Sequence, residues 1–139
     1  MNKLFFSLMI SMITSIASFA QCDKNFVINS SKTEYLSADS SVERAVEENT
    51  IIEVTRPTIS ITPAGKKMTA TIKSETCNWT TPFIEGKTVI KATFTDEQGE
   101  AKNATITIEG KNGKLMLWVT AEEMPTIIRV AIDKFEQKN

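Results

Sequence analysis

The pattern of hydrophobic and polar residues predicts two consecutive β-hairpins in the second half of the chain. Residues 87–95 alternate with a period of two, so that Ile90 and Phe94 share one face while lysine and threonine side chains share the other. Gly99 can adopt the positive φ of a bulged three-residue turn, which would place Ile90 opposite Ile106. A one-residue slip would turn the apolar row outward, so we expect this register.

The second hairpin turns at Asn112-Gly113, and its register stays open at this point. A two-residue type I′ turn would pair Ile108 with Leu117, whereas a bulge at the glycine would pair Ile108 with Met116. The pattern does not choose between them, because the strand after the turn is apolar on both faces. Such a strand needs a cover on its outer side, which the chain itself or a partner would have to supply.

Alternation also runs through the first half of the chain and the C-terminal segment 126–135. Ile59 and Ile61 point together, and a loop over residues 63–66 would return the chain so that Ile61 faces Met68 and Ile59 faces Ala70. The segments 24–36 and 51–55 also have the composition of strands.

One segment, residues 41–48 and their neighbours, fits two structures. Ser40 and Glu43 form a capping box for a two-turn helix whose apolar face would hold Val42 and Val46. The same residues alternate as a strand that leads into Ile51. The sequence therefore leaves one short helix open here.

These segments predict an all-β protein, an antiparallel meander of about eight short strands with no long helical pattern between them. Closure into a barrel would remove the open edges of such a sheet, so a barrel is the expected architecture. A β-sandwich is the alternative, because Pro57 interrupts a strand and could mark a change of sheet.

The first 20 residues have the features of a secretory signal peptide. Lys3 supplies the positive charge, residues 4–16 the apolar segment, and Ser18-Phe19-Ala20 a cleavage site with small residues. We therefore expect residues 1–20 to be removed and residues 21–139 to form a single secreted or periplasmic domain.

The chain has two cysteines, Cys22 and Cys77, and both would remain after processing. An even number of cysteines in an exported chain predicts one disulfide between them. The alternative is a lipidated Cys22 in an envelope lipoprotein, which is the one route by which we expect a membrane association. Gln21 argues against lipidation, because the residue before a lipidated cysteine is normally small.

The sequence offers no catalytic site, metal site or cofactor motif. It contains 0 histidines, which removes the commonest general base and metal ligand. Lys and Arg number 16 against 17 Asp and Glu, mixed along the chain, which argues against nucleic-acid binding. A carboxylate-based hydrolase is a remote alternative that needs two inward acids, and the alternation places Glu75 and Glu109 on outward phases.

The secretion signal, the meander of about eight strands and the polar tail resemble the small secreted lipocalin-like (calycin-like) barrels of Gram-negative bacterial envelopes. The resemblance is architectural. Lys24-Asn25-Phe26 stands where the lipocalin signature Gly-x-Trp would be expected, so no ligand residue is carried over. The resemblance implies that a small apolar molecule inside the barrel is a fair expectation.

Two functions follow from these patterns, and neither fixes the oligomeric state. The first is a non-catalytic module that binds a small apolar ligand with inward residues, drawn from Ile59, Ile61, Ile72, Ile90, Phe94, Ile106 and Val130. The second is a structural or protein-interaction module of the cell envelope. Its candidate interaction face consists of Trp79, Met116 and Trp118.

Overall fold

The computed structural model describes residues 24–63, 65, 67–96 and 98–138, and these form one sheet of nine strands. The expected signal peptide, its cleavage site and Cys22 lie outside the described residues. Among the described residues, we find no helix with the length and hydropathy that a membrane crossing requires. The strands are β1 (Phe26–Leu36), β2 (Val42–Thr55), β3 (Thr58–Pro63), β4 (Met68–Thr81), β5 (Glu85–Thr95), β6 (Ala101–Lys111), β7 (Lys114–Ala121), β8 (Ile127–Ala131) and β9 (Lys134–Gln137).

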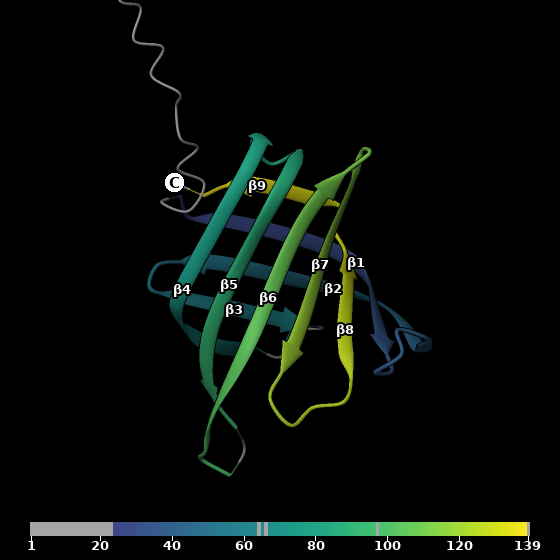
Figure 1. Ribbon diagram of the computed structural model, residues 1–139, viewed down its shortest axis with the longest axis vertical. Coiled ribbons are helices and arrows are strands. Elements are labelled where there is room, and N and C mark those ends of the chain that lie inside the picture. Colours follow the sequence, from purple (N-terminus) through teal and green to yellow (C-terminus); the bar gives the residue numbers. More distant parts are fainter. Residues whose placement is uncertain (1–23, 64, 66, 97, 139) are drawn as a thin grey trace, which may run out of the picture.

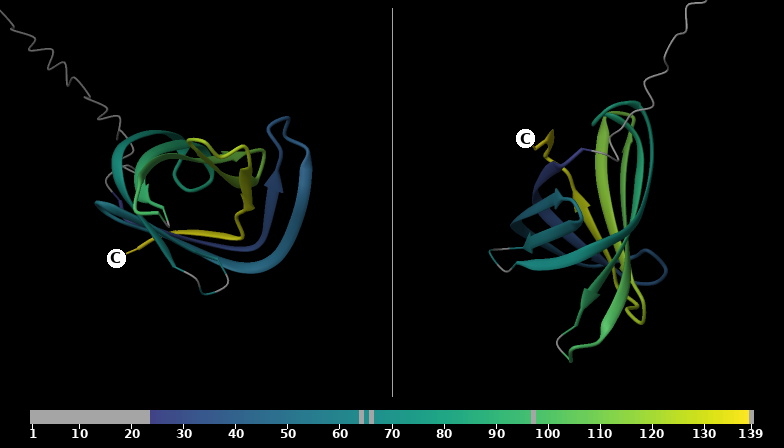
Figure 2. Two further views of the ribbon diagram at one scale, coloured as in Figure 1. Left: turned by 90° about the horizontal axis from the view of Figure 1, so that it is seen from below. Right: turned by 90° about the vertical axis from the view of Figure 1, so that its left-hand side faces the viewer.

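The sheet closes into a barrel. Each strand from β2 to β7 pairs with the next along the chain, and all of the pairings are antiparallel. Closure comes from β1, which pairs with β2 on one edge and with β8 and β9 on the other. Figures 1 and 2 show β4–β7 arching across one side while β1, β2 and β3 cross behind them. The barrel expectation is confirmed, and the sandwich alternative is wrong.

The registers predicted from alternation and turn chemistry are confirmed. Ile90 pairs with Ile106, and the turn between their strands is closed by a hydrogen bond of 2.9 Å from the Asp96 amide to the Glu100 carbonyl. The structure also decides the hairpin that the sequence left open. Asn112 has φ of 54° and the following glycine 76°, as a type I′ turn requires, and Ile108 therefore pairs with Leu117.

Two local expectations need correction. The segment that fitted a short helix, residues 41–48, is not helical, because from Val42 onward it is part of the long strand β2 and pairs with β1. The ladder with β1 satisfies its backbone groups and overrides the capping-box signal. The segment 126–135 is not one strand either, since it bends after Ala131 and forms β8 and β9, which pair with successive parts of β1.

A β-bulge reverses the expected direction of Glu75. The register between β4 and β5 shifts between Ile72 and Ser74, so one extra residue stands on β4. Beyond the bulge, Glu75 pairs with the inward residue Ile90, and the Glu75 side chain is 7% exposed. The expectation that Glu75 faces outward is therefore wrong. Glu109 alternates with the buried Ile108 and stays on the outer face.

Inward apolar rows of all strands meet in one hydrophobic core. Its members are 8% exposed or less and come from both the N-terminal and the C-terminal strands. Buried threonine and serine side chains extend the core at one place on β1 and β2, where Thr33 and Thr50 hydroxyls lie 3.4 Å apart. The core consists of Phe26, Ile28, Ile52, Val54, Ile59, Trp79, Ile90, Ala92, Ile106, Ile108, Leu117, Val130 and Phe135.

Aromatic rings close the end of the barrel beside β9. The Phe135 ring meets those of Phe26, Phe83 and Trp79 edge to face, with centroids 5.1, 4.7 and 5.9 Å away. Trp79 donates its indole N–H to the Thr88 hydroxyl at 2.6 Å, so its polar atom is satisfied inside the core. The short C-terminal strand thus contributes the ring that holds this end together.

An ion pair joins parts of the chain that no strand pairing joins. β3 pairs with β4 only over Met68–Thr71, so the later part of β4 has no strand partner on that side within the described residues. The Arg56 guanidinium, in the turn between β2 and β3, donates to both oxygens of Glu75. Its second terminal nitrogen also donates to the carbonyl oxygen of Lys24 at 3.1 Å.

We expect Phe135→Ala to lower the free energy of unfolding by about 3 kcal/mol, because it empties the centre of the aromatic group. Urea denaturation followed by tryptophan fluorescence measures this change. Glu136→Ala, an exposed neighbour on the same strand, is the control and should stay within about 0.5 kcal/mol of the parent chain. Equal effects of both substitutions would contradict the structural role of the ring.

We expect Glu75→Gln to cost about 1–3 kcal/mol of unfolding free energy, because it leaves the partly buried Arg56 guanidinium without its charged acceptor. The same denaturation assay measures it. Glu109→Gln, the identical change on the outer face, should be close to neutral. A neutral Glu75→Gln would show that the pair does not hold β4 to the turn.

Candidate binding hollow on the outer face

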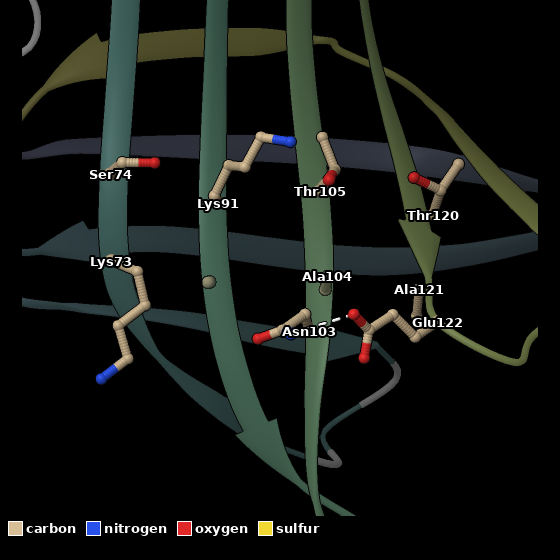
Figure 3. Close-up of a pocket in the computed structure, with 10 residues that line it drawn as sticks. Lys73, Ser74, Lys91, Asn103, Ala104, Thr105, Thr120, Ala121 and Glu122 are labelled. Carbon is tan, nitrogen blue, oxygen red and sulfur yellow. Dashed lines mark hydrogen bonds between the residues drawn. The ribbon is translucent and has the colours of Figure 1, made fainter.

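A hollow of about 560 Å³ lies over the strands β4–β7. Direct cross-strand neighbours form one side of it, because Ser74 pairs with Lys91, Lys91 with Thr105, and Thr105 with Thr120. Lys91 and Thr105 alternate with the buried Ile90 and Ala104, which places this row on the outer face of the barrel. Figure 3 shows the side chains on the four neighbouring strands. The lining is completed by Lys73, Ala92, Asn103, Ala104, Ala121 and Glu122.

Small residues and the β4 bulge shape this part of the sheet. Ala92, Ala104 and Ala121 pair across three adjacent strands, and because Ala92 and Ala104 are buried and face the interior, the hollow is bordered at this level by backbone. The bulge leaves Lys73 between the paired positions of β4, and a bulge increases the local bend and twist of a strand. The walls of the hollow are therefore backbone and polar side chains.

Hydrogen bonds fix the edge of the hollow that Asn103 and Glu122 form. Asn103 accepts from the Thr93 hydroxyl and donates from its side-chain amide to the Glu122 carboxylate, both at 3.0 Å. The Glu122 backbone amide also donates to the Asn103 carbonyl oxygen at 3.0 Å. Figure 3 draws the contact between the two side chains. Asn103 and Glu122 are therefore held in place before any ligand arrives.

Lys73 and Lys91, the two lysines of the hollow, differ from the nearby Lys102, which forms ion pairs with two glutamates. Among the described residues we find no ion pair of Lys73 or Lys91, and both are exposed. Lys102, on the same sheet, contacts Glu123 at 2.5 Å and Glu100 at 3.3 Å. Its hydrogen bond to Glu123, and then the one to Glu100, raises the pKa of Lys102 above its ordinary value. The lysines of the hollow thus keep their donors for a ligand.

The seven residues expected to line an interior site lie elsewhere. Four of them are core residues exposed by 3% or less, namely Ile59, Ile90, Ile106 and Val130. Ile61 and Ile72 pack against that core, and Phe94 is half-buried. None of the seven lines the hollow over β4–β7. A second hollow of about 500 Å³ lies over β1 and β2, and none of the seven lines it either; it is formed by Ser31, Lys32, Glu47, Glu48 and Asn49.

The expected interaction face is divided by the structure. Trp79 is 3% exposed and belongs to the core, because the β4 bulge turns its side chain inward. Met116 and Trp118 lie on the outer face of β7 and are half-buried. Trp118 pairs with Arg129 of β8, whose guanidinium donates to Glu34 at 2.7 Å. Trp79 therefore has no place in an outer face, whereas Met116 and Trp118 do.

Cys77 lies on β4, half-buried and paired with Thr88, whose hydroxyl donates to its sulfur at 3.5 Å. Its expected partner Cys22 is outside the described residues, so the disulfide stays a prediction. In the part of the chain that the structure describes, no group of three or more His, Cys, Asp or Glu side chains is arranged to hold a metal ion.

The hollow could not be predicted from the sequence, for a physical reason. Outward lysines and threonines on a strand have the pattern of an ordinary solvated face, and alternation says nothing about which of them gather. The bulge at Lys73 has no recognisable pattern in the sequence.

Comparisons with protein-family models and with curated proteins found no match to this chain. The lipocalin-like resemblance is therefore supported at the level of architecture, by the closed antiparallel meander barrel.

Proposed function

We propose that this chain is an exported, non-catalytic binding module of the cell envelope whose ligand site is the outer hollow over β4–β7. The ligand class that fits best is a small acidic saccharide. The observation that carries this proposal is the presence, in one concave area, of hydroxyl and amide groups beside two lysines that form no ion pair with any described residue.

The lining groups complement the chemistry of such a ligand. The ammonium groups of Lys73 and Lys91 are donors for a carboxylate or sulfate, and charge-assisted hydrogen bonds are the stronger kind. The hydroxyls of Thr105 and Thr120 both donate and accept, as binding of sugar hydroxyls requires. Glu122 supplies one further acceptor at the edge.

A binding role suits the hollow better than hydrolysis does. Carboxylate-based glycoside hydrolysis uses two acids on opposite sides of the scissile bond. The lining contains one carboxylate, Glu122, and it accepts a hydrogen bond from Asn103. The inward acid Glu75 is engaged by Arg56 on a different part of the barrel.

An apolar ligand inside the barrel fits the structure less well than a polar ligand in the outer hollow does. Six of the seven residues expected to line an interior site, all except Phe94, belong to the core or pack against it, and a ligand would have to displace their packing. Met116 and Trp118 remain a candidate face for an envelope partner. Native mass spectrometry of exported protein bears on the choice, since a copurified apolar molecule would place the site in the interior.

We expect acidic oligosaccharides to bind the parent chain and neutral ones of equal length to bind far more weakly. Oligogalacturonate and maltooligosaccharide are suitable probes in an NMR titration. The double substitution Lys73→Ala/Lys91→Ala should weaken oligogalacturonate binding by up to about thirtyfold, because each lost ammonium group removes a charged contact worth up to about 1 kcal/mol at the surface.

Lys87→Ala/Lys111→Ala removes the same charge from exposed positions outside the hollow and should leave the affinity unchanged. Binding of oligogalacturonate should also weaken as salt rises, because exposed charges are screened. The proposal is wrong if neither oligosaccharide shifts resonances of β4–β7, or if both double variants lose affinity equally.

A further inference from the structure

β2 presents a strand edge that the barrel does not use. β3 pairs with β2 only over Thr50–Thr55. Over Val42–Asn49, β2 pairs within the described residues only with β1, so its other edge carries free backbone donors and acceptors. Figure 2 shows the hairpin of β1 and β2 extending beyond the body of the barrel, where this edge meets no neighbouring strand. Its side chains are exposed or half-buried.

We propose that this edge, Val42–Asn49, pairs antiparallel with the same edge of a second copy, which makes one continuous sheet across a two-fold axis. Strand addition at an open edge is a general mode of association, because main-chain hydrogen bonds supply affinity. A self-complementary edge suits a two-fold symmetric dimer, in which both copies use the same surface.

Charges on an edge strand normally prevent pairing, but here they favour one register. When Val46 lies opposite Val46 of the other copy, Arg44 lies opposite Glu48 twice and no two like charges are opposed. A shift by one residue in one direction sets Glu43 against Glu48, and a shift by two sets Glu43 against Glu47. Like charges directly opposite each other destabilise a strand pair.

Glu48 supplies an independent reason for this register. One of its carboxylate oxygens is buried and has no hydrogen-bond partner in the structure. Arg44 lies over the Tyr35 ring, with its guanidinium carbon 4.3 Å from the ring centroid. Arg44 and Val46 pair with Tyr35 and Thr33, and Glu48 lies in the β-bulge that follows, between Glu47 and Thr50. In the proposed register Arg44 of a second copy stands opposite this glutamate and would approach its carboxylate.

A single strand pair buries little area, so the dimer should be weak and should dissociate on dilution. Sedimentation equilibrium of the exported chain over a range of concentrations should show a monomer and a species of twice its mass. Arg44→Glu should shift the dissociation constant at least about tenfold toward monomer, because it places like charges opposite each other. The swap Arg44→Glu/Glu48→Arg should restore the dimer.

Lys111→Glu, the same charge change at the exposed last position of β6, is the control and should not alter the dissociation constant. Circular dichroism of each variant confirms that the barrel is folded. The inference is overturned if the parent chain is monomeric at every concentration, if Arg44→Glu leaves the dimer intact, or if the charge swap fails to restore it.

Cross-linking tests the register separately from the charges. In Val46→Cys the two introduced sulfurs would face each other across the axis, within the Cα separation that a disulfide allows. In Glu43→Cys they would be about 20 Å apart, since six residues separate them along the pair. A covalent dimer of the first variant alone supports the register, whereas equal cross-linking of both contradicts it.

Discussion

The barrel exists because β1 has hydrogen-bonding partners along both of its edges. A meander of hairpins leaves its first and last strands open, and unpaired edges are both unsatisfied and prone to aggregation. Here β2 occupies one edge of β1, while β8 and β9 occupy successive parts of the other. The bend after Ala131 is what allows one short C-terminal segment to follow β1 over almost its whole length. The core residues of every strand depend on this closure for their common interior.

Unequal strand lengths explain most of the remaining features. β2 and β4 have 14 residues each, while β3 between them has 6. The barrel therefore has two stretches where a long strand runs beyond its short neighbour. On β4 the stretch is held by the ion pair between Arg56 and Glu75. On β2 the corresponding stretch has no strand partner on its outer edge within the described residues. The same difference in strand length is thus compensated by an ion pair on β4 and leaves an exposed edge on β2.

Alternation and turn chemistry were sufficient for the fold because they act locally. At the turn around Gly99, the glycine and the apolar rows on both sides agreed on one register, which pairs Ile90 with Ile106. Prediction from the sequence failed where one extra residue reverses which side chains of a strand point inward, and where a helix and a strand fit the same segment. The bulge beside Lys73 turned Glu75 and Trp79 inward, and a bulge can be placed at many positions of a polar strand. Residues 41–48 satisfied both a helix and a strand, and the β1 ladder decided between them.

The candidate site lay beyond the sequence for a related reason. Alternation identifies which side chains are inside, and in a small barrel with one core these side chains largely fill the interior that they define. Features that could bind something then arise where the outer face departs from regularity. The hollow forms beside the bulge that displaces Lys73, and the open edge forms where β3 ends. Both depend on strand lengths and bulges, so the candidate binding features of this barrel arise from irregularities of the strand ladder and not from its inward rows.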